Sequence, residues 1–292
     1  MKIVVTLNET YIYPLRVMLY SLFSTQEETV TVILLHSDIK KEQVRELKTF
    51  CECYGERFSE VRIEGGLFEE APVAKYFSKE MYYRLLCPWL LSEEDRVLYL
   101  DPDMIVTASL SSLYHMDLEG AALAAGRDRP IGVDHEKRLC MKKGITYVNS
   151  GMLLMDLKRM RERRKEEIFD LIKERKNELM FPDQDVINLF WGDNIKMVED
   201  AYNFNSNILF FKEYLCAPFP KKMKKYACII HYMGKDKPWN RGYMKGMYLY
   251  WARAEWKVNP SKRLVIAGRL LLEPCRFLYG LYMFWKNHNW KK

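Results

Sequence analysis

Short apolar runs alternate along the first half of the chain with segments in which apolar positions recur every three to four residues. A short apolar run predicts a buried strand, and the wider spacing predicts an amphipathic helix. We expect strands at 3–7, 30–36, 60–64, 97–101 and 121–126, and helices at 13–23, 40–52, 78–90 and 109–116. Regular alternation of this kind predicts an α/β fold with a mostly parallel central sheet flanked by helices.

The second half of the chain continues with longer elements. The apolar segment 147–155 predicts a strand, and the Lys-, Arg- and Glu-rich segment 157–177 predicts a helix with a solvated face. A shorter helix is expected from about 183 to 191, with Asp183 as its N-cap, and a buried strand at 227–231. An irregular aromatic stretch at 202–219 lies between them and is our candidate for the side of the site that receives an acceptor.

Positive charge is concentrated at the C-terminal end of the chain. Residues 253–292 hold nine Lys/Arg and two Asp/Glu, which accounts for the whole formal charge of +7. We expect residues 1–252 to form one domain and residues 253–292, the C-terminal segment, to form a basic helical appendage. A nucleic-acid-binding protein would carry a basic face on the body itself, so no nucleic-acid partner is expected.

The C-terminal segment has the composition of an anchor on a membrane surface. Lys262, Arg269 and Arg276 are spaced by seven and would share one helical face, although Pro274 interrupts the helix. The aromatic residues of the segment are Trp256, Phe277, Tyr279, Tyr282, Phe284, Trp285 and Trp290. Basic amphipathic segments with aromatic edges bind anionic membranes. The alternative is a helix packed on the body with its charges in solvent.

The cysteines and the hydropathy predict a cytoplasmic protein. Seven cysteines without a Cys-x-x-Cys pair are typical of reduced thiols. The apolar run at 3–7 is too short for a signal peptide, and no stretch reaches about 18 apolar residues, the length that a membrane span needs. Together with the C-terminal segment, this predicts a peripheral location on the inner face of the cell membrane.

Two carboxylates follow the apolar run 97–100, in the tripeptide Asp101-Pro102-Asp103. Ligands bind beyond the carboxyl ends of strands in open α/β sheets, and paired carboxylates suit Mg²⁺ or Mn²⁺. A turn at the end of the strand is the plain alternative. The pattern also resembles the nucleophile motif of haloacid-dehalogenase-type phosphatases, in which Asp101 would attack phosphorus and Asp103 would be the general acid.

Three later segments add polar residues that could complete such a site. His231 ends an apolar run and could be a third metal ligand, while Gly234 and Lys237 behind it suit a phosphate. Asn149-Ser150-Gly151 could bind sugar hydroxyls, and Asp183-Gln184-Asp185 forms a dense polar cluster. Each segment taken alone also has a structural explanation as a turn, a cap or a buried histidine.

Taken in order, these motifs resemble the family-8 glycosyltransferases over roughly residues 1–240, most closely the bacterial lipopolysaccharide galactosyl- and glucosyltransferases, with glycogenin and galactinol synthase more distant. The motifs that carry the resemblance are Asn8-Glu9-Thr10-Tyr11, Tyr76…Arg84, Asp101-Pro102-Asp103, Asn149-Ser150-Gly151, Asp183-Gln184-Asp185 and His231…Lys237-Pro238-Trp239. The resemblance implies a GT-A fold and transfer of a hexose from a UDP-sugar, with retention at the anomeric carbon and usually with Mn²⁺.

The resemblance also implies roles for individual residues. Asp101, Asp103 and His231 match the metal ligands. The remaining matches are Asn8, Thr10 and Tyr11 for uridine, Gly234 and Lys237 for the diphosphate, Arg84, Asp128, Asn149, Ser150 and Gly151 for the donor sugar, and Asp183 and Gln184 beside the reacting carbon. Ser150 replaces the alanine that is common in the family.

The expected reaction moves a hexose from UDP-glucose or UDP-galactose to a glycan or lipid-linked acceptor. Because a neutral amide is a weak nucleophile, we expect the acceptor hydroxyl to attack from the same face, with Gln184 stabilising the oxocarbenium-like carbon and Asp183 holding sugar hydroxyls. Two alternatives remain from the sequence, the phosphatase that uses Asp101 and Asp103 and a non-catalytic membrane- or glycan-binding module.

Overall fold

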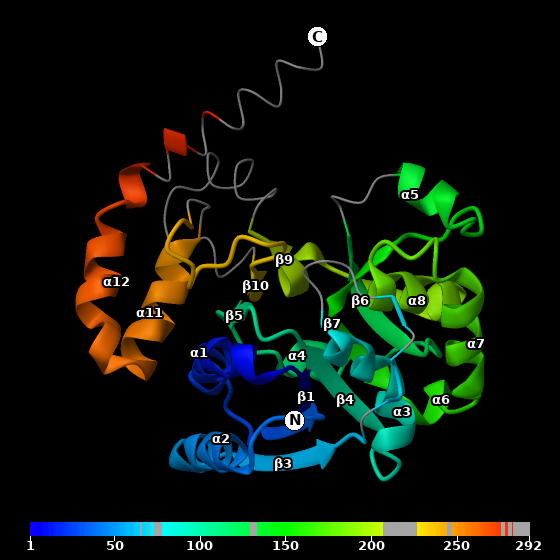
Figure 1. The fold of residues 1–292 in the computed structure, drawn as a ribbon, viewed down its shortest axis with the longest axis horizontal. Coiled ribbons are helices and arrows are strands. Elements are labelled where there is room, and N and C mark those ends of the chain that lie inside the picture. The colour runs from blue at the N-terminus through cyan, green and yellow to red at the C-terminus, as the bar shows by residue number, and fades with distance from the viewer. Residues whose placement is uncertain are drawn as a thin grey trace.

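The computed structural model describes residues 1–64, 66–69, 71–72, 78–128, 133–206, 227–243, 247–275, 278–279 and 282. A seven-stranded sheet in the order β3-β2-β1-β4-β7-β6-β8 forms the centre of the molecule (Figure 1). Its strands are β1 Lys2–Thr6, β2 Thr31–His36, β3 Arg57–Arg62, β4 Arg96–Leu100, β6 Leu123–Arg127, β7 Val148–Asp156 and β8 Ile195–Val198. A second sheet, β5-β10-β9, contains Met104–Val106, Ile229–His231 and Phe204–Asn205.

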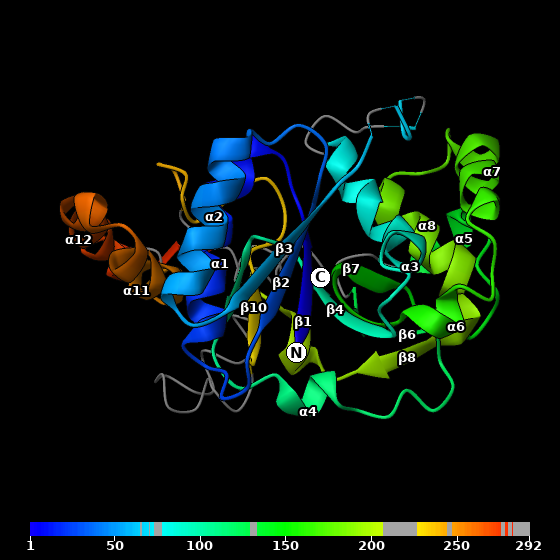
Figure 2. The ribbon, with the colours of Figure 1, turned by 90° about the horizontal axis from the view of Figure 1, so that it is seen from below.

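Helices cover both faces of the large sheet (Figure 2). Ile3 and Val5 of β1 point to one face and pack with α1 and α2, whereas Val4 points to the other face and packs with α7 and α8. The α-helices are α1 Ile12–Phe23, α2 Lys41–Cys53, α3 Cys87–Leu90, α4 Ser111–Tyr114, α5 Val133–Arg138, α6 Leu157–Met160, α7 Glu166–Arg175, α8 Pro182–Trp191, α11 Tyr248–Val258 and α12 Arg263–Leu270. Short 3₁₀ helices are η1 Glu9–Tyr11, η2 Lys79–Leu86, η3 Gly192–Asn194, η4 Asp200–Asn203 and η5 Pro260–Lys262.

The expected mostly parallel sheet is confirmed, but one strand runs against it. β4 pairs with β1 in parallel and with β7 antiparallel, so β7 is the strand that runs opposite to the others. Reversal of β7 places its start, not its end, beside the carboxyl end of β4, and Leu100 pairs with Met152. The Asn149-Ser150-Gly151 segment is thereby brought next to Asp101, whose backbone N–H donates to the Gly151 carbonyl at 2.8 Å.

Several expected elements differ in extent, three of them for reasons that the structure shows. The strand expected at 60–64 is Arg57–Arg62, because pairing with β2 runs along the whole of that range. The helix expected at 78–90 divides into η2 and α3, and Pro88, which has no N–H to donate, lies at the division. The helix expected at 157–177 divides into α6 and α7 at 161–165, where four of five residues are basic and Arg161 instead donates to three backbone carbonyls.

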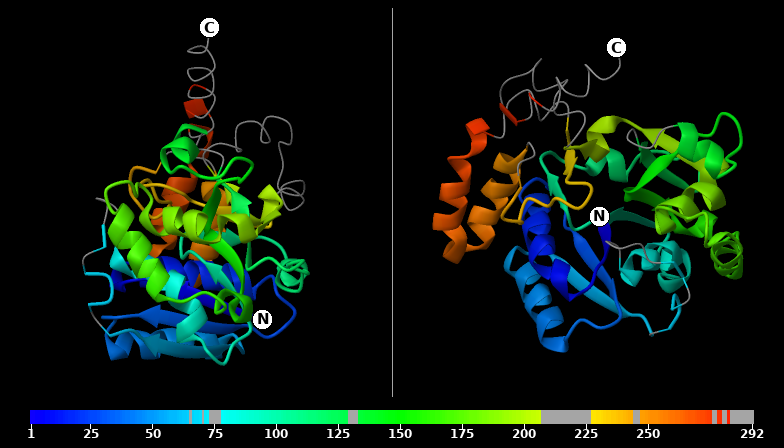
Figure 3. Two further views of the ribbon diagram at one scale, coloured as in Figure 1. Left: turned by 90° about the vertical axis from the view of Figure 1, so that its right-hand side faces the viewer. Right: turned by 45° about the horizontal axis from the view of Figure 1, so that its top comes forward.

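Helices α11 and α12 lie side by side at one edge of the molecule (Figure 3, orange). Trp251 and Tyr248 of α11 are buried against Val17 of α1 and Ile230 of β10. Glu255 of α11 accepts a hydrogen bond from the Tyr13 hydroxyl. Among the described residues, no helix has the length and apolar composition that a bilayer span requires.

Candidate active site

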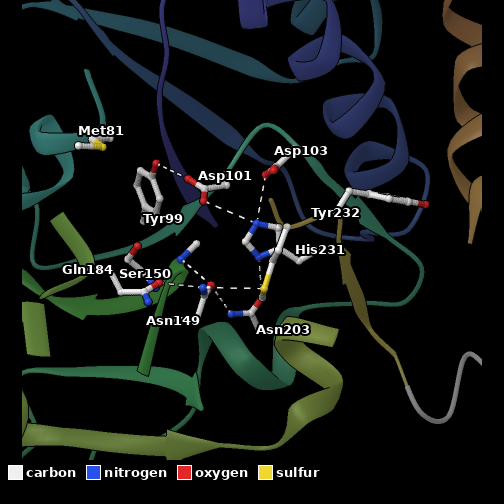
Figure 4. Close-up of polar contacts among 12 residues, drawn as sticks. Met81, Tyr99, Asp101, Asp103, Asn149, Ser150, Gln184, Asn203, His231 and Tyr232 are labelled. Atoms are coloured by element: carbon white, nitrogen blue, oxygen red, sulfur yellow. Dashed lines mark hydrogen bonds and ion pairs between the residues drawn. The ribbon is translucent and has the colours of Figure 1, made fainter. Parts of the chain in front are cut away.

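Asp101, Asp103 and His231 converge at the carboxyl edge of the large sheet (Figure 4). Asp101 and Asp103 follow β4, and the chain then continues into β5, which pairs antiparallel with β10. His231 is the last residue of β10 and pairs with Met104, which brings it beside Asp103. Nε2 of His231 lies 3.2 Å from Oδ1 of Asp103 and 3.8 Å from Oδ2 of Asp101. The three residues therefore share one site, as the sequence predicted.

This cluster fits a divalent cation. The three side chains offer ligand atoms within 4.8 Å of one another, and two carboxylates with one imidazole suit Mn²⁺. Oδ1 of Asp103 is buried without a hydrogen-bond partner among the described residues. Gly151 leaves the space open, because a β-carbon there would lie 2.3 Å from Cε1 of His231 and 2.8 Å from Oδ2 of Asp101. Both the donor set and the space match a metal site.

Lys237 brings a positive charge to the same cluster. Its ammonium group pairs with Oδ2 of Asp103 and donates to the Tyr232 carbonyl at 2.9 Å. Burial alone would raise the pKa of Asp103, but Lys237 and His231 outweigh it and hold that pKa well below its usual range. The pKa of Lys237 is raised, since the attraction of Asp103 exceeds the effect of burial. Lys237 therefore keeps a positive charge beside Asp103.

Arg84 connects Asp101 to α8. It is buried in η2, with its guanidinium 3.0 Å from Oδ1 of Asp101 and 3.2 Å from Oδ2 of Asp183. It also donates to the Ser150 carbonyl at 2.8 Å and lies over the ring of Tyr99. Although burial opposes its charge, the adjacent Asp101 and Asp183 keep the pKa of Arg84 above its usual value. Arg84 thus holds two carboxylates that would otherwise repel each other.

The first turn of α8 presents its side chains to this site. The helix begins at Pro182 with Phe181 as N-cap, so the expectation of Asp183 as N-cap is wrong. Asp183 instead reaches Arg84 and accepts a hydrogen bond from the Ser150 hydroxyl at 3.0 Å. Asp185 accepts from the N–H groups of Met180 and Phe181, so it holds the start of the helix.

Gln184 lies at the centre of a buried amide network. Its Oε1 accepts hydrogen bonds from Nδ2 of Asn149 at 2.8 Å and from the backbone N–H of Ser150 at 3.1 Å. Its Nε2 donates to Oδ2 of Asp128 at 3.0 Å and to the Tyr147 hydroxyl at 3.2 Å. The donor-sugar residues inferred from the sequence, Asp128, Asn149 and Ser150, are thus joined to Gln184 by direct contacts.

The residues expected to contact uridine, Asn8, Thr10 and Tyr11, are half-buried or exposed. Oδ1 of Asn8 accepts from the N–H of Thr10 at 3.1 Å and from the Thr10 hydroxyl at 2.6 Å, so Asn8 caps η1. Tyr11 packs edge-on against Trp239 with ring centroids 5.8 Å apart, and burial raises its pKa. Gly234 has a φ of +85°, a conformation that favours glycine.

The structure adds one residue that the sequence did not single out. Asn203, at the end of η4, contacts both His231 and Asn149. No local pattern marks it, because it is one amide in an irregular aromatic stretch.

Some residues singled out in the sequence lie outside the described residues. They are Tyr76, residues 207–219 of the aromatic stretch, and Arg276, Phe277, Phe284, Trp285 and Trp290 of the C-terminal segment.

The comparisons with known proteins agree with this geometry. A family model described as glycosyl transferase family 8 matches residues 2–242. Glycosyltransferase GlyF of Streptococcus pneumoniae is 30% identical over 240 residues, which cover 82% of this chain and 57% of GlyF. The lipopolysaccharide 1,2-glucosyltransferase of Escherichia coli K12 is 30% identical over 190 residues, which cover 63% of this chain and 56% of that protein. The chain thus spans little more than half the length of these relatives.

Solved structures give the fold. The galactosyltransferase LgtC, in complex with donor and acceptor sugar analogues, superposes with a TM-score of 0.77 at 21% identity, over 89% of this chain and 96% of that one. GlyE of S. pneumoniae superposes with a TM-score of 0.67 at 24% identity, over 94% of this chain and 63% of that one. The fold is therefore GT-A. Because the family model spans most of the chain and every residue of the site described above, the protein belongs to glycosyl transferase family 8.

Proposed function

We propose that the protein is a retaining glycosyltransferase that uses Mn²⁺ or Mg²⁺ and moves glucose or galactose from a UDP-sugar to a saccharide or glycolipid acceptor. The observation that carries the proposal is the convergence of Asp101, Asp103 and His231 next to Gln184 and Arg84, inside the region that the family model matches. Carboxylates, an imidazole and a buried arginine in one site suit a diphosphate joined to a polar sugar.

Asp101, Asp103 and His231 would hold the cation. Bound there, it would supply positive charge that stabilises the departing diphosphate. Lys237 adds a second positive charge on the same side, and charges fixed in advance of the reaction often make the largest contribution to catalysis. Tyr11 and Trp239 at the rim offer aromatic surface for the uracil base.

The donor sugar would lie against Asp183, Asn149 and Asp128. Gln184 is positioned beside it, but both its Oε1 hydrogen bonds come from fixed donors, Asn149 and the Ser150 N–H. An oxygen that already accepts two hydrogen bonds has little electron density left for a bond to carbon. This supports attack by the acceptor hydroxyl on the same face of the sugar, with the amide stabilising positive charge there.

The test is a panel of UDP-sugars with Mn²⁺, scored by release of UDP, with and without a chelator. Glucose or galactose should give the highest rate, and the chelator should abolish it. Proton NMR of the first-formed product then reports the anomeric configuration. Release of phosphate from aryl phosphates with no UDP release would favour the phosphatase alternative, and binding of UDP-sugar without turnover would favour a non-catalytic module.

We also propose that the C-terminal segment binds an anionic membrane, which would suit lipid-linked acceptors. The proposal is based on exposed apolar side chains in this segment. Leu264 is 89% exposed, Leu271 81% and Leu278 64%. The side chains of Arg253 and Lys257 in α11 and of Arg263, the first residue of α12, are also exposed. Exposed leucines beside basic residues suit insertion at the headgroup level of an acidic bilayer.

Lys262 and Arg269, whose spacing predicted a basic face for the membrane, both contact the body of the protein instead. Nζ of Lys262 lies 3.7 Å from the centre of the Tyr13 ring, and Arg269 donates to the carbonyls of Pro238 and Asn240. Membrane binding would therefore depend on the leucines. Leu264→Asp with Leu271→Asp should reduce sedimentation with phosphatidylserine vesicles, and Met197→Asp, on β8, is the matched surface control. Equal binding by both variants would contradict this location.

A further inference from the structure

We propose that Asn203 is a positioning residue that fixes the imidazole of His231 in the tautomer with hydrogen on Nδ1, so that the lone pair on Nε2 faces the metal side of the site. The inference rests on the metal site of the proposed function. Asn203 lies at the end of η4, immediately before β9, and its side chain is buried between the metal-ligand cluster and the amide network (Figure 4).

Two hydrogen bonds place Asn203. Its Oδ1 lies 2.9 Å from Nδ1 of His231, and its Nδ2 lies 2.8 Å from Oδ1 of Asn149. The backbone supports this arrangement, because β9 pairs in parallel with β10 and the Ser206 N–H donates to the His231 carbonyl at 3.1 Å. One amide thus joins the histidine of the metal cluster to the asparagine of the donor-sugar cluster.

The backbone N–H of Gly151, which can only donate, determines the direction of these hydrogen bonds. A backbone N–H can only donate, and the N–H of Gly151 points to Asn149 at 3.0 Å, so the atom that receives it must be the oxygen of Asn149. The opposite end of the Asn149 amide faces Oδ2 of Asp128 and Oε1 of Gln184, both acceptors, which requires its NH₂ group there. The orientation of Asn149 is therefore determined from both ends.

The remaining roles follow in sequence. Because Asn149 presents its oxygen to Asn203, Asn203 must present its NH₂ group to Asn149 and its oxygen to His231. An oxygen acceptor at Nδ1 requires hydrogen on that nitrogen. In the neutral imidazole, Nε2 then carries the lone pair, and Nε2 is the nitrogen that lies near Asp101 and Asp103.

This arrangement is what a metal-binding histidine needs. Such a histidine usually donates its other N–H to an oxygen acceptor, and loss of that acceptor typically weakens metal binding about 10- to 100-fold. Gly126 lies against the other side of Asn203, where a β-carbon would lie 3.1 Å from Cβ of Asn203, so the asparagine is confined as well as hydrogen-bonded.

The experiment is Mn²⁺ titration of the full chain without donor, followed by electron paramagnetic resonance of the free ion. Asn203→Leu removes both hydrogen bonds, keeps the branching at Cγ and the number of side-chain heavy atoms, and should weaken Mn²⁺ binding about 10- to 100-fold. Asn203→Asp keeps an oxygen acceptor for Nδ1 but loses the donor to Oδ1 of Asn149, and it should bind Mn²⁺ more tightly than Asn203→Leu. Asn205→Leu, at a buried amide two residues further along the chain in β9, is the matched control and should stay close to the wild type.

A second readout reports the tautomer itself. ¹⁵N NMR of histidine-labelled protein with Mg²⁺, with the His231 signals assigned by their loss in His231→Gln, should show hydrogen on Nδ1 and none on Nε2. Hydrogen on Nε2 in the wild type, or full Mn²⁺ affinity in Asn203→Leu, would overturn the inference. If Asn203→Leu does not fold, the ¹⁵N NMR of the wild type and the Mn²⁺ affinity of Asn203→Asp still test the inference. Absence of Mn²⁺ binding by the wild type would instead contradict the proposed metal dependence.

Discussion

Lys237, which is half-buried, and Asp103, which is buried, form an ion pair, so a residue expected to bind the diphosphate contacts a residue expected to bind the metal. The pairing offsets the cost of burying each charge, as the lowered pKa of Asp103 and the raised pKa of Lys237 both indicate. A cation entering the site meets the positive charge of Lys237 beside one of its own ligands. Lys237 would then favour binding of metal together with an anionic donor over binding of metal alone.

Lys237→Met should therefore have opposite effects on two ligands. Without donor, Mn²⁺ should bind more tightly, by about three- to tenfold, since a nearby positive charge is removed. UDP should bind more weakly in the presence of Mn²⁺ because a cation for its phosphates is lost. Calorimetric titration measures both, and the exposed neighbour Lys235→Met is the control. Weaker Mn²⁺ binding by Lys237→Met would show that the lysine instead preorganises the cluster.

Gly151→Ala should abolish or strongly weaken metal binding. The added β-carbon would lie within 3 Å of atoms in both His231 and Asp101, and both side chains are held by hydrogen bonds or ion pairs. We expect Mn²⁺ affinity to fall at least 100-fold with the fold retained, measured by titration and circular dichroism. In Gly242→Ala, the control, the β-carbon would meet no described atom within 4 Å, and it should bind Mn²⁺ normally.

Asp183 should show opposite effects on stability and activity. Burial, reinforced by Asp101 and opposed by Arg84, raises the pKa of Asp183 above its usual 3.8. Since the folded state favours the protonated carboxyl, this residue's contribution to stability is full below pH 3.8 and is lost as the pH rises through the raised pKa. Asp183→Asn, which is neutral throughout, should match or exceed the wild-type Tm at pH 7.5 and lose that advantage toward pH 4.

Thermal denaturation at the two pH values measures the effect, with the exposed Asp170→Asn as the control for removing one carboxylate. The same Asp183→Asn variant should lose most of its UDP-sugar turnover, because the carboxylate that would hold the sugar is gone. A Tm at pH 7.5 clearly below that of the wild type would mean that the ion pair with Arg84 outweighs the cost of burial.

Gln184→Ala should separate chemistry from binding. We expect kcat to fall about 100-fold or more while the Kd for UDP with Mn²⁺ stays within about threefold, because the amide would stabilise charge at the reacting carbon and not the nucleotide. Stopped-assay turnover and UDP titration measure the two quantities. Val186→Ala in the same helix, a buried apolar residue, controls for loosening of α8. An unchanged kcat in Gln184→Ala would remove the amide from the mechanism.

Arg269→Lys should raise the KM for the UDP-sugar. Arg269 of α12 donates to the carbonyls of Pro238 at 2.6 Å and Asn240 at 2.5 Å and lies over the Tyr248 ring, so it supports the loop that carries Lys237. Both bonds come from Nη2 of Arg269. Lysine is shorter and lacks the planar guanidinium that lies over Tyr248, so it should hold the two carbonyls less well. We expect KM to rise about fivefold with a small change in kcat. Arg263→Lys, also in α12, is the control, and an equal KM in both variants would contradict a supporting role for Arg269.

The candidate site was predictable to a large extent because its residues follow strand ends. Asp101 and Asp103 come directly after an apolar run, and His231 ends another, so the sheet brings them to one edge. Asn203 could not be found in this way. It is the last residue of a 3₁₀ helix in an aromatic stretch, and its role depends on contacts with residues 54 and 28 positions away along the chain.

The sequence did not predict in which direction a strand runs or which way a helix face points. β7 has the same apolar pattern whether it runs parallel or antiparallel to β4, so the reversal that places Asn149 and Gly151 beside Asp101 is invisible in the sequence. The seven-residue spacing of Lys262 and Arg269 correctly places both on one side of the helix pair, but not the side that faces solvent. In both cases periodicity defines which residues share a face, and only packing decides what that face meets.

The sequence by itself determined the α/β class, the family resemblance and the residue types of the site, because these depend on local periodicity and on motifs of a few residues. Only the tertiary structure decided the pairing of Arg84 with two carboxylates, the contact of Lys237 with Asp103 and the hydrogen bonds that run from Gly151 through Asn149 and Asn203 to His231. The physical reason is that the role of a buried polar group is set by its partners, and those partners come from distant parts of the chain.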